Sequence, residues 1–225
     1  MGRSFGPESK ASEFGLARNM DLYLLLAFIP AALALNFTPG ADMMFCLGQG
    51  LRSGTKAAVA ASAGISLGAM IHMALAGAGL GAIVATVPWV FDVIRWVGVA
   101  YLLWLAWGAL RASSVENGKV QGLSAGKAFR QGLIVNLSNP KVILFVLAFV
   151  PQFVDPSKGS VFVQFMVFGS IIALGGFVVN GLVGAFSGTA GRALTGSVRF
   201  QRGLGYTTAA IFAALAARLA IMEKA

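Results

Sequence analysis

Two charged side chains stand alone inside apolar stretches of this sequence, and each follows a proline. Asp42 lies three residues beyond Pro39, and Lys141 comes directly after Pro140. A lone charge within a membrane span costs at least about 2.5–3.5 kcal/mol on insertion scales, so such a residue is a functional-site hypothesis by default. The structural alternative is that Asp42 caps a half-helix and Lys141 reaches toward the membrane surface. We favour a site for an ion or a zwitterion, because both charges sit beside a helix breaker.

Each proline is expected to interrupt a helix and to free backbone groups. Proline has no N–H and displaces the carbonyl four residues earlier, and within lipid the freed groups must be satisfied by protein or by a water-lined cavity. The N–H groups that begin the next half-helix favour an anion, whereas freed carbonyls favour a cation. Two such breaks facing each other would form a site in which Asp42 receives an amine or a coupling proton. Lys141 and the helix N-termini would receive a carboxylate.

Polar and helix-breaking residues around the two prolines complete the predicted solute pathway. They are Asn36, Thr38, Gly40, Asn136 and Asn139, beside Pro39 and Pro140 themselves. The three asparagines either satisfy the freed carbonyls or contact the solute, and both roles are compatible.

One histidine and one cysteine occur in the chain. His72 could act as a proton relay, but a hydrogen bond to a neighbouring helix is the more common role. Cys46 alone cannot form an intrachain disulfide or a cysteine-rich metal site, and its apolar neighbours favour simple packing.

The composition indicates that these residues are held by membrane-spanning helices. The 225 residues are 57% hydrophobic and 11% charged, whereas soluble domains are about 25% charged. No charged residue occurs in 57–91 or in 159–191, and a span needs about 20 mainly apolar residues. The net charge of +9 comes from cations scattered singly between apolar runs, which is typical of loop charges at a lipid surface rather than of nucleic-acid binding.

Charge gaps and helix breakers predict an all-α integral membrane protein with six transmembrane helices. The predicted spans are 22–51, interrupted at Pro39, then 57–84, 89–110, 132–154, interrupted at Pro140, 160–186 and 203–222. Residues 1–19 form a polar, disordered extension, and 20–225 form a single transporter domain; a cleaved signal peptide is the alternative for the N-terminal segment. Lys and Arg are somewhat more numerous in the loops after the first, third and fifth spans, which favours both termini outside.

The two halves of the chain, about 20–110 and 128–225, resemble each other. Aligning Pro39 with Pro140 also superimposes Gly68 on Gly169. Three spans per half is an odd number, so the second half would enter the membrane upside down, as in the 3+3 inverted repeats of many secondary transporters. Runs of small residues such as Gly64-x3-Gly68 predict close helix contacts.

Several of these segments resemble signatures of the LysE/RhtB-type amino-acid exporters. They are Asn-Phe-Thr-Pro-Gly-Ala-Asp at 36–42, Gly98-x2-Tyr101-Leu102-x2-Leu105, and Phe129-x2-Gly132-x3-Asn136-x2-Asn139-Pro140-Lys141 followed by Pro-Gln-Phe at 151–153. One departure is Ala41, where many members carry proline or serine. The resemblance implies export of amino acids or close derivatives across the bacterial inner membrane by a multi-pass protein. It also implies proton antiport with alternating access, and no cofactor.

Other functions remain open at this stage. A cation or metal transporter would share the architecture, although hard cations want several carboxylates and only Asp42 lies clearly at membrane depth. An intramembrane enzyme is less favoured, because a serine hydrolase needs a base beside its nucleophile and His72 is the only histidine. A purely structural helical subunit would tolerate loss of both charges. We therefore predict a transporter rather than an enzyme, with an amino acid, protons and lipid as partners; a homo-oligomer is possible.

Overall fold

The computed structural model describes residues 22–84, 90–111, 122–187 and 198–221, and within these ranges the chain forms helices and no strand. The main helices are α2 (Leu22–Phe37), α3 (Ala41–Ser53), α4 (Thr55–Val84), α5 (Val90–Arg111), α6 (Ala125–Leu137), α7 (Pro140–Leu144), α8 (Val161–Ala185) and α10 (Val198–Ile221). A π-helical turn, η3 (Phe145–Phe149), and two 3₁₀ turns, η4 (Val150–Phe153) and η5 (Pro156–Lys158), follow α7. The predicted extension at 1–19 lies outside the described residues.

Both predicted helix breaks are present. The axis bends by 52° between α2 and α3, on either side of Pro39, and by 50° between α6 and the segment from Pro140 to Phe153. In each case the chain resumes helical structure within a few residues: α3 begins two residues after Pro39, and Pro140 itself occupies the first turn of α7, a position that proline fits. The two breaks are therefore confirmed, and they divide the helices about halfway along.

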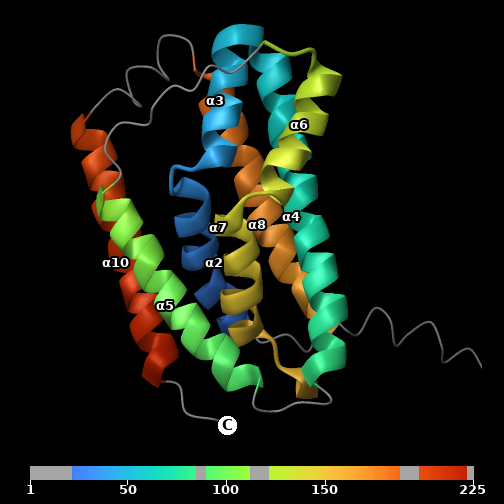
Figure 1. The fold of residues 1–225 in the computed structure, drawn as a ribbon, viewed down its shortest axis with the longest axis vertical. Coiled ribbons are helices and arrows are strands. Elements are labelled where there is room, and N and C mark those ends of the chain that lie inside the picture. The colour runs from blue at the N-terminus through green and yellow to red at the C-terminus, as the bar shows by residue number, and fades with distance from the viewer. Residues whose placement is uncertain (1–21, 85–89, 112–121, 188–197, 222–225) are drawn as a thin grey trace, which may run out of the picture.

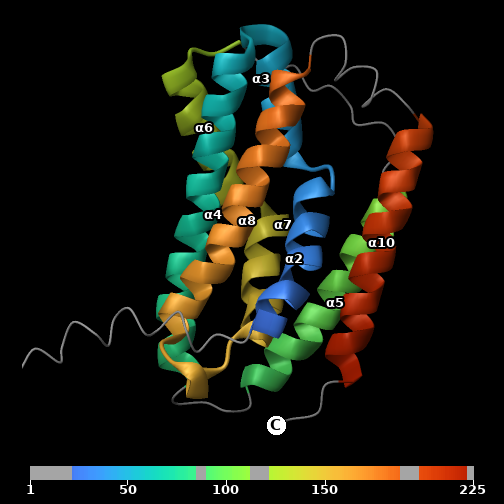
Figure 2. The same ribbon diagram turned by 180° about the vertical axis from the view of Figure 1, so that it is seen from behind.

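The two broken helices run in opposite directions, with their breaks at a similar height in the molecule (Figure 1). The long helices α4 and α8 pack against each other, and α8 also contacts α2 and α3 (Figure 2). The remaining pair, α5 and α10, pack together on one side, where α10 touches α2 and α5 touches η3. If each bent pair is taken as one segment, successive segments alternate in direction (Figure 1), as a chain that crosses a bilayer repeatedly requires.

Length and apolar composition mark two of the described helices as clear membrane spans. These are the segments 55–79 of α4 and 161–185 of α8, and the number rises to four if each bent pair counts as one span. The apolar parts of α5 and α10 are shorter, at 96–108 and 205–217. The six-span topology is therefore still a prediction, although all six predicted segments contain helix.

A cluster of buried aromatic rings fills the part of the bundle where α2, η3, η4 and α8 meet. Phe28 of α2 is fully buried, and its ring lies 4.6 Å from that of Phe168 in α8 and 5.2 Å from that of Phe153 in η4, measured between centroids. Phe145 and Phe149 extend the cluster along η3. These contacts fix the first half-helix of one broken span against the second half-helix of the other.

Glycine allows the backbones of α4 and α6 to come into direct contact. A Cβ atom placed on Gly64 would lie 2.0 Å from the carbonyl oxygen of Phe129, and one on Gly132 would lie 2.3 Å from that of Ala61. Side chains cannot occupy such positions, so only glycine permits this packing. The predicted contact surface at Gly64-x3-Gly68 is confirmed, since a Cβ atom on Gly68 would lie 2.7 Å from the side-chain oxygen of Asn136.

The fourth predicted span starts too late. The prediction begins this span at residue 132, beyond the charges of Lys127 and Arg130, whereas α6 begins at Ala125. Lys127 and Arg130 are exposed, whereas Ala128 and Gly132 are buried. A helix can extend beyond its apolar stretch when charged side chains leave on one face only.

Candidate functional site

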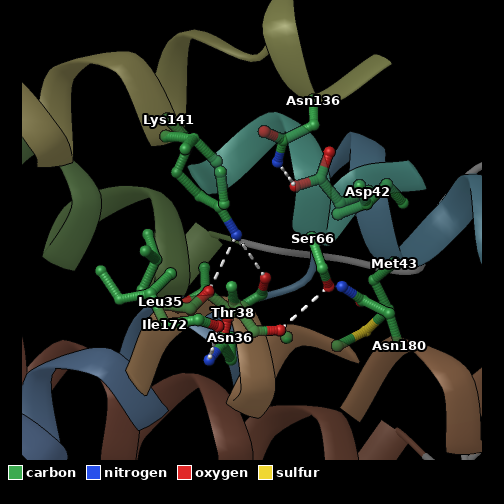
Figure 3. Close-up of a pocket in the computed structure, with 15 residues that line it drawn as sticks. Leu35, Asn36, Thr38, Asp42, Met43, Ser66, Asn136, Lys141, Ile172 and Asn180 are labelled. Carbon is green, nitrogen blue, oxygen red and sulfur yellow. Dashed lines mark hydrogen bonds between the residues drawn. The ribbon is translucent and has the colours of Figure 1, made fainter. Parts of the chain in front are cut away.

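The two helix breaks meet around a small polar cavity near the middle of the bundle (Figure 3). Its volume is about 20 Å³, which is room for roughly one water molecule. Its lining combines polar, charged and apolar residues, which are Leu35, Asn36, Thr38, Asp42, Met43, Ile65, Ser66, Ala69, Asn136, Lys141, Val142, Ile172, Ala173, Gly176 and Asn180. Five predicted site residues thus lie together here: Asn36, Thr38, Asp42, Asn136 and Lys141.

Asp42 is a buried carboxylate in the first turn of α3, only 7% exposed. The position favours negative charge because the positive end of the helix dipole is there. Its Oδ2 accepts a hydrogen bond of 2.8 Å from Nδ2 of Asn136 in the other broken helix (Figure 3). Its Oδ1 has no hydrogen-bond partner, and neither does Oδ1 of Asn136. Buried polar atoms are nearly always paired, so these two oxygens are suited to receive donors from a solute.

Lys141 reaches across from the second broken helix to the first. Its Nζ donates to the carbonyl oxygens of Leu35, at 3.0 Å, and Thr38, at 2.9 Å (Figure 3). The Leu35 carbonyl is four residues before Pro39, so it is the group that the proline deprives of its helical donor. The expectation that freed carbonyls favour a cation is met here by the protein's own ammonium group. Reaching toward the membrane surface does not describe this lysine.

The second break has a matching arrangement. Its freed carbonyl, four residues before Pro140, belongs to Asn136, and it accepts from the backbone N–H of Asn139 at 2.9 Å. Nε2 of His72 in α4 lies 3.3 Å from the same oxygen, so this nitrogen carries the proton in that contact. His72 is outside the central cavity, and its contact is the helix-to-helix hydrogen bond that the sequence favoured over a relay.

The other predicted site residues shape the breaks rather than line the cavity. The side chain of Asn139 caps the next half-helix by accepting from the N–H of Lys141 at 3.1 Å. Gly40 is the N-cap of α3, and Pro140 occupies the first turn of α7 with its ring exposed. Of the five predicted residues that do line the cavity, Thr38 also bonds its own helix, because its hydroxyl donates to the carbonyl of Ala34.

Sequence reasoning missed three polar residues in and around this site. Ser66 and Asn180 line the cavity, and Ser66 donates to the carbonyl of Ala173 at 2.9 Å. The hydroxyl of Tyr101 in α5 donates to the carbonyl of Lys141 at 2.8 Å. A usable signal was present, because each is a polar side chain within a mainly apolar helix.

The sequence matches a known family over most of its length. The LysE type translocator family matches residues 33–223, which include both helix breaks and α10. The chain belongs to the LysE family of translocators. It is accordingly a membrane transport protein, and the resemblance stated from its motifs is confirmed.

Several bacterial proteins have similar sequences. An uncharacterized membrane protein of Vibrio cholerae is 35% identical over 153 residues, covering 67% of this chain and 74% of that protein. A homoserine/homoserine lactone efflux protein of Salmonella typhimurium is 33% identical over 146 residues, covering 64% and 70%. A leucine efflux protein of Enterobacter is 31% identical over 172 residues, covering 74% and 78%. No solved structure gives a significant match.

In this LysE-family chain, the motif at 36–42 contains the first helix break and the motif at 129–141 contains the second, and the cavity lies between these two breaks. Across the described residues, no three His, Cys, Asp or Glu side chains lie close enough to one another to hold a metal ion. The functional relatives named above are efflux proteins rather than enzymes.

Proposed function

We propose that this protein is a secondary transporter that exports amino acids or close derivatives across the bacterial inner membrane. Family membership and two sets of relatives named as efflux proteins support the general activity. The observation that carries the mechanism is the cavity between the two breaks, which holds one buried carboxylate and one ammonium group. A zwitterion offers the complementary pair of charges.

Asp42, Asn136 and Lys141 would bind the solute in this scheme. Asp42 and the unpaired oxygen of Asn136 accept hydrogen bonds from the amine of an amino acid, or Asp42 carries the coupling proton. Lys141 and the N–H groups that begin the new half-helices receive the carboxylate. The polar side chains of Asn36 and Thr38 complete the wall beside the first break, where Asn36 also donates to the carbonyl of Ile172 at 3.2 Å.

Proton antiport with alternating access is the transport mode that we propose. A cavity of about 20 Å³ holds a water molecule but no amino acid, so the site must open to load and to release its solute. Antiparallel broken helices around a central site (Figure 1) are the arrangement that inverted repeats produce. We therefore retain the six-span, 3+3 inverted repeat as the framework that rocks about the site.

The apolar part of the cavity bears on the side chain that is carried. Leu35, Met43, Ile65, Val142 and Ile172 surround the polar groups, and Asp42 and Lys141 balance each other in charge. A solute with a neutral side chain leaves no charge unpaired there, whereas a second ammonium group would. Homoserine and leucine, the solutes named for the two relatives above, both fit this description.

A cation transporter of the same architecture is the alternative candidate. It would use Asp42 and the freed carbonyls as ligands and would not depend on an amino acid. The experiment below separates the two, because dipeptide loading supplies amino acids without changing the metal content of the medium.

Expression of the protein is expected to accelerate amino-acid efflux from dipeptide-loaded bacteria. Peptidases release the amino acids inside the cell, and the external concentration is then followed by chromatography for leucine, homoserine and arginine. We expect the neutral solutes to leave at least about tenfold faster than arginine, because burying one unpaired charge costs several kcal/mol. If expression changes the efflux of no amino acid tested, the proposed function is wrong.

A further inference from the structure

Two backbone carbonyls at the first break form a cation-binding pair. Pro39 removes the helical donor of the Leu35 carbonyl, and the bend ends the helix before the Thr38 carbonyl can be used. Both oxygens therefore point out of the helix end, which carries the negative end of its dipole. Within lipid such carbonyls require a donor at all times.

The donor in this structure is a side chain that can leave. Lys141 belongs to α7, and it contacts the two carbonyls only through Nζ, at the end of a flexible four-carbon side chain. An ammonium group has three N–H donors, the same number as the α-ammonium group of a free amino acid. Gly40 leaves room for this group, because a Cβ atom there would lie 3.3 Å from Nζ.

We propose that the Leu35 and Thr38 carbonyls are the ammonium subsite of the transporter, and that Lys141 fills it whenever the carrier is empty. The inference rests on the proposed function. An incoming amino acid places its own ammonium group on the carbonyl pair, and the displaced Lys141 turns to the carboxylate of the same solute. Asp42 is then left free to carry the coupling proton. Lys141 acts as a built-in substitute for the solute.

The scheme separates two modes of transport. Net efflux requires the carrier to return empty, so the carbonyl pair needs the lysine during that step. Exchange of one amino acid for another moves only loaded carriers, and the solute itself supplies the ammonium group. Removing the lysine therefore impairs net efflux more than exchange.

The test uses the full-length protein in proteoliposomes with the variant Lys141→Ala. The substitution removes three methylene groups and the ammonium group, which together have the shape of propylammonium. At saturating solute, the ratio of net efflux to exchange is expected to fall about tenfold, the size of one lost hydrogen bond to a charged group. Millimolar propylammonium should restore it, whereas tetramethylammonium, which has no N–H, should not. Lys127→Ala, which changes an exposed lysine of α6, should behave like the wild type.

An unchanged ratio overturns the proposal, and so does a lowered ratio that propylammonium fails to raise. A second readout needs no transport and so distinguishes failure of this inference from failure of the proposed function. In detergent without solute, propylammonium should raise the melting temperature of Lys141→Ala and leave that of the wild type unchanged, because ligands stabilise only the state with a free site. If the variant purifies poorly, propylammonium during extraction should raise its folded yield. If propylammonium raises neither the melting temperature nor the folded yield of Lys141→Ala, the proposed ammonium subsite is wrong, even if amino-acid export is confirmed.

Discussion

Replacing Asp42 by asparagine is expected to reduce net amino-acid efflux by between about tenfold and a hundredfold, the range for loss of a charge-assisted hydrogen bond. Asparagine has nearly the same shape, and its carbonyl oxygen can still accept from Nδ2 of Asn136, the contact now made at 2.8 Å. It cannot carry a proton or balance an ammonium group. The variant should therefore fold and insert normally but fail to transport, as dipeptide-loaded cells would show.

The matched control changes a carboxylate that lies outside the spans. Asp155 follows η4, and hydrogen bonds from Ser157 hold the pKa of its carboxyl below the usual range. Asp155→Asn thus also removes one negative charge, but far from the cavity, and should leave efflux within about twofold, as distant surface changes usually do. Equal efflux by Asp42→Asn and wild-type cells, at equal protein levels, would remove Asp42 from the mechanism.

Adding one methyl group at Gly64 is expected to destabilise the fold more than any change in the cavity. In Gly64→Ala the new Cβ would lie 2.0 Å from the carbonyl oxygen of Phe129. Neither backbone can rotate away, so α4 and α6 must separate along their shared face. Overpacking usually costs about 1–3 kcal/mol and occasionally more, and the backbone contact places this substitution at the upper end. Size-exclusion chromatography after heating should show a markedly lower temperature at which the folded, monodisperse protein is lost.

Gly79→Ala provides the comparison within the same helix. A Cβ atom on Gly79 meets nothing within 4 Å, and alanine favours helix over glycine by about 1 kcal/mol. This variant should be as stable as the wild type or slightly more so. A Gly64→Ala protein with an unaltered melting profile would show that the two helices are not packed as described.

Much of the fold could be predicted from charge gaps and prolines. The long helices α4 and α8 lie where two uncharged stretches required them, and the bends fall at Pro39 and Pro140. Both features depend on local chemistry, namely the cost of burying charge and the missing proline N–H. The start of α6 was misplaced, because exposed lysine and arginine on a helix end look like loop residues in a linear sequence.

The pairing of polar groups could not be predicted in the same way. That Asp42 meets Asn136, and that Lys141 reaches Leu35, depends on which faces of two distant helices come together. Sequence reasoning could say that the freed carbonyls needed donors and could not say which donors. Ser66 was missed for a related reason, since a serine in an apolar helix can bond its own backbone instead.

The most direct test of the central claim asks whether the two breaks touch inside the folded protein. In a Cys46→Ser background, Asp42→Cys and Asn136→Cys are combined, a protease site is placed within residues 112–121, and the thiols are bridged with mercuric ion. Because the native side chains are 2.8 Å apart, the two halves should migrate together after cleavage. Ser53→Cys with Gly122→Cys is the positive control, since a Cβ atom on Gly122 would lie 3.2 Å from the Ser53 hydroxyl. Bridging of the control pair without bridging of the central pair would contradict the account.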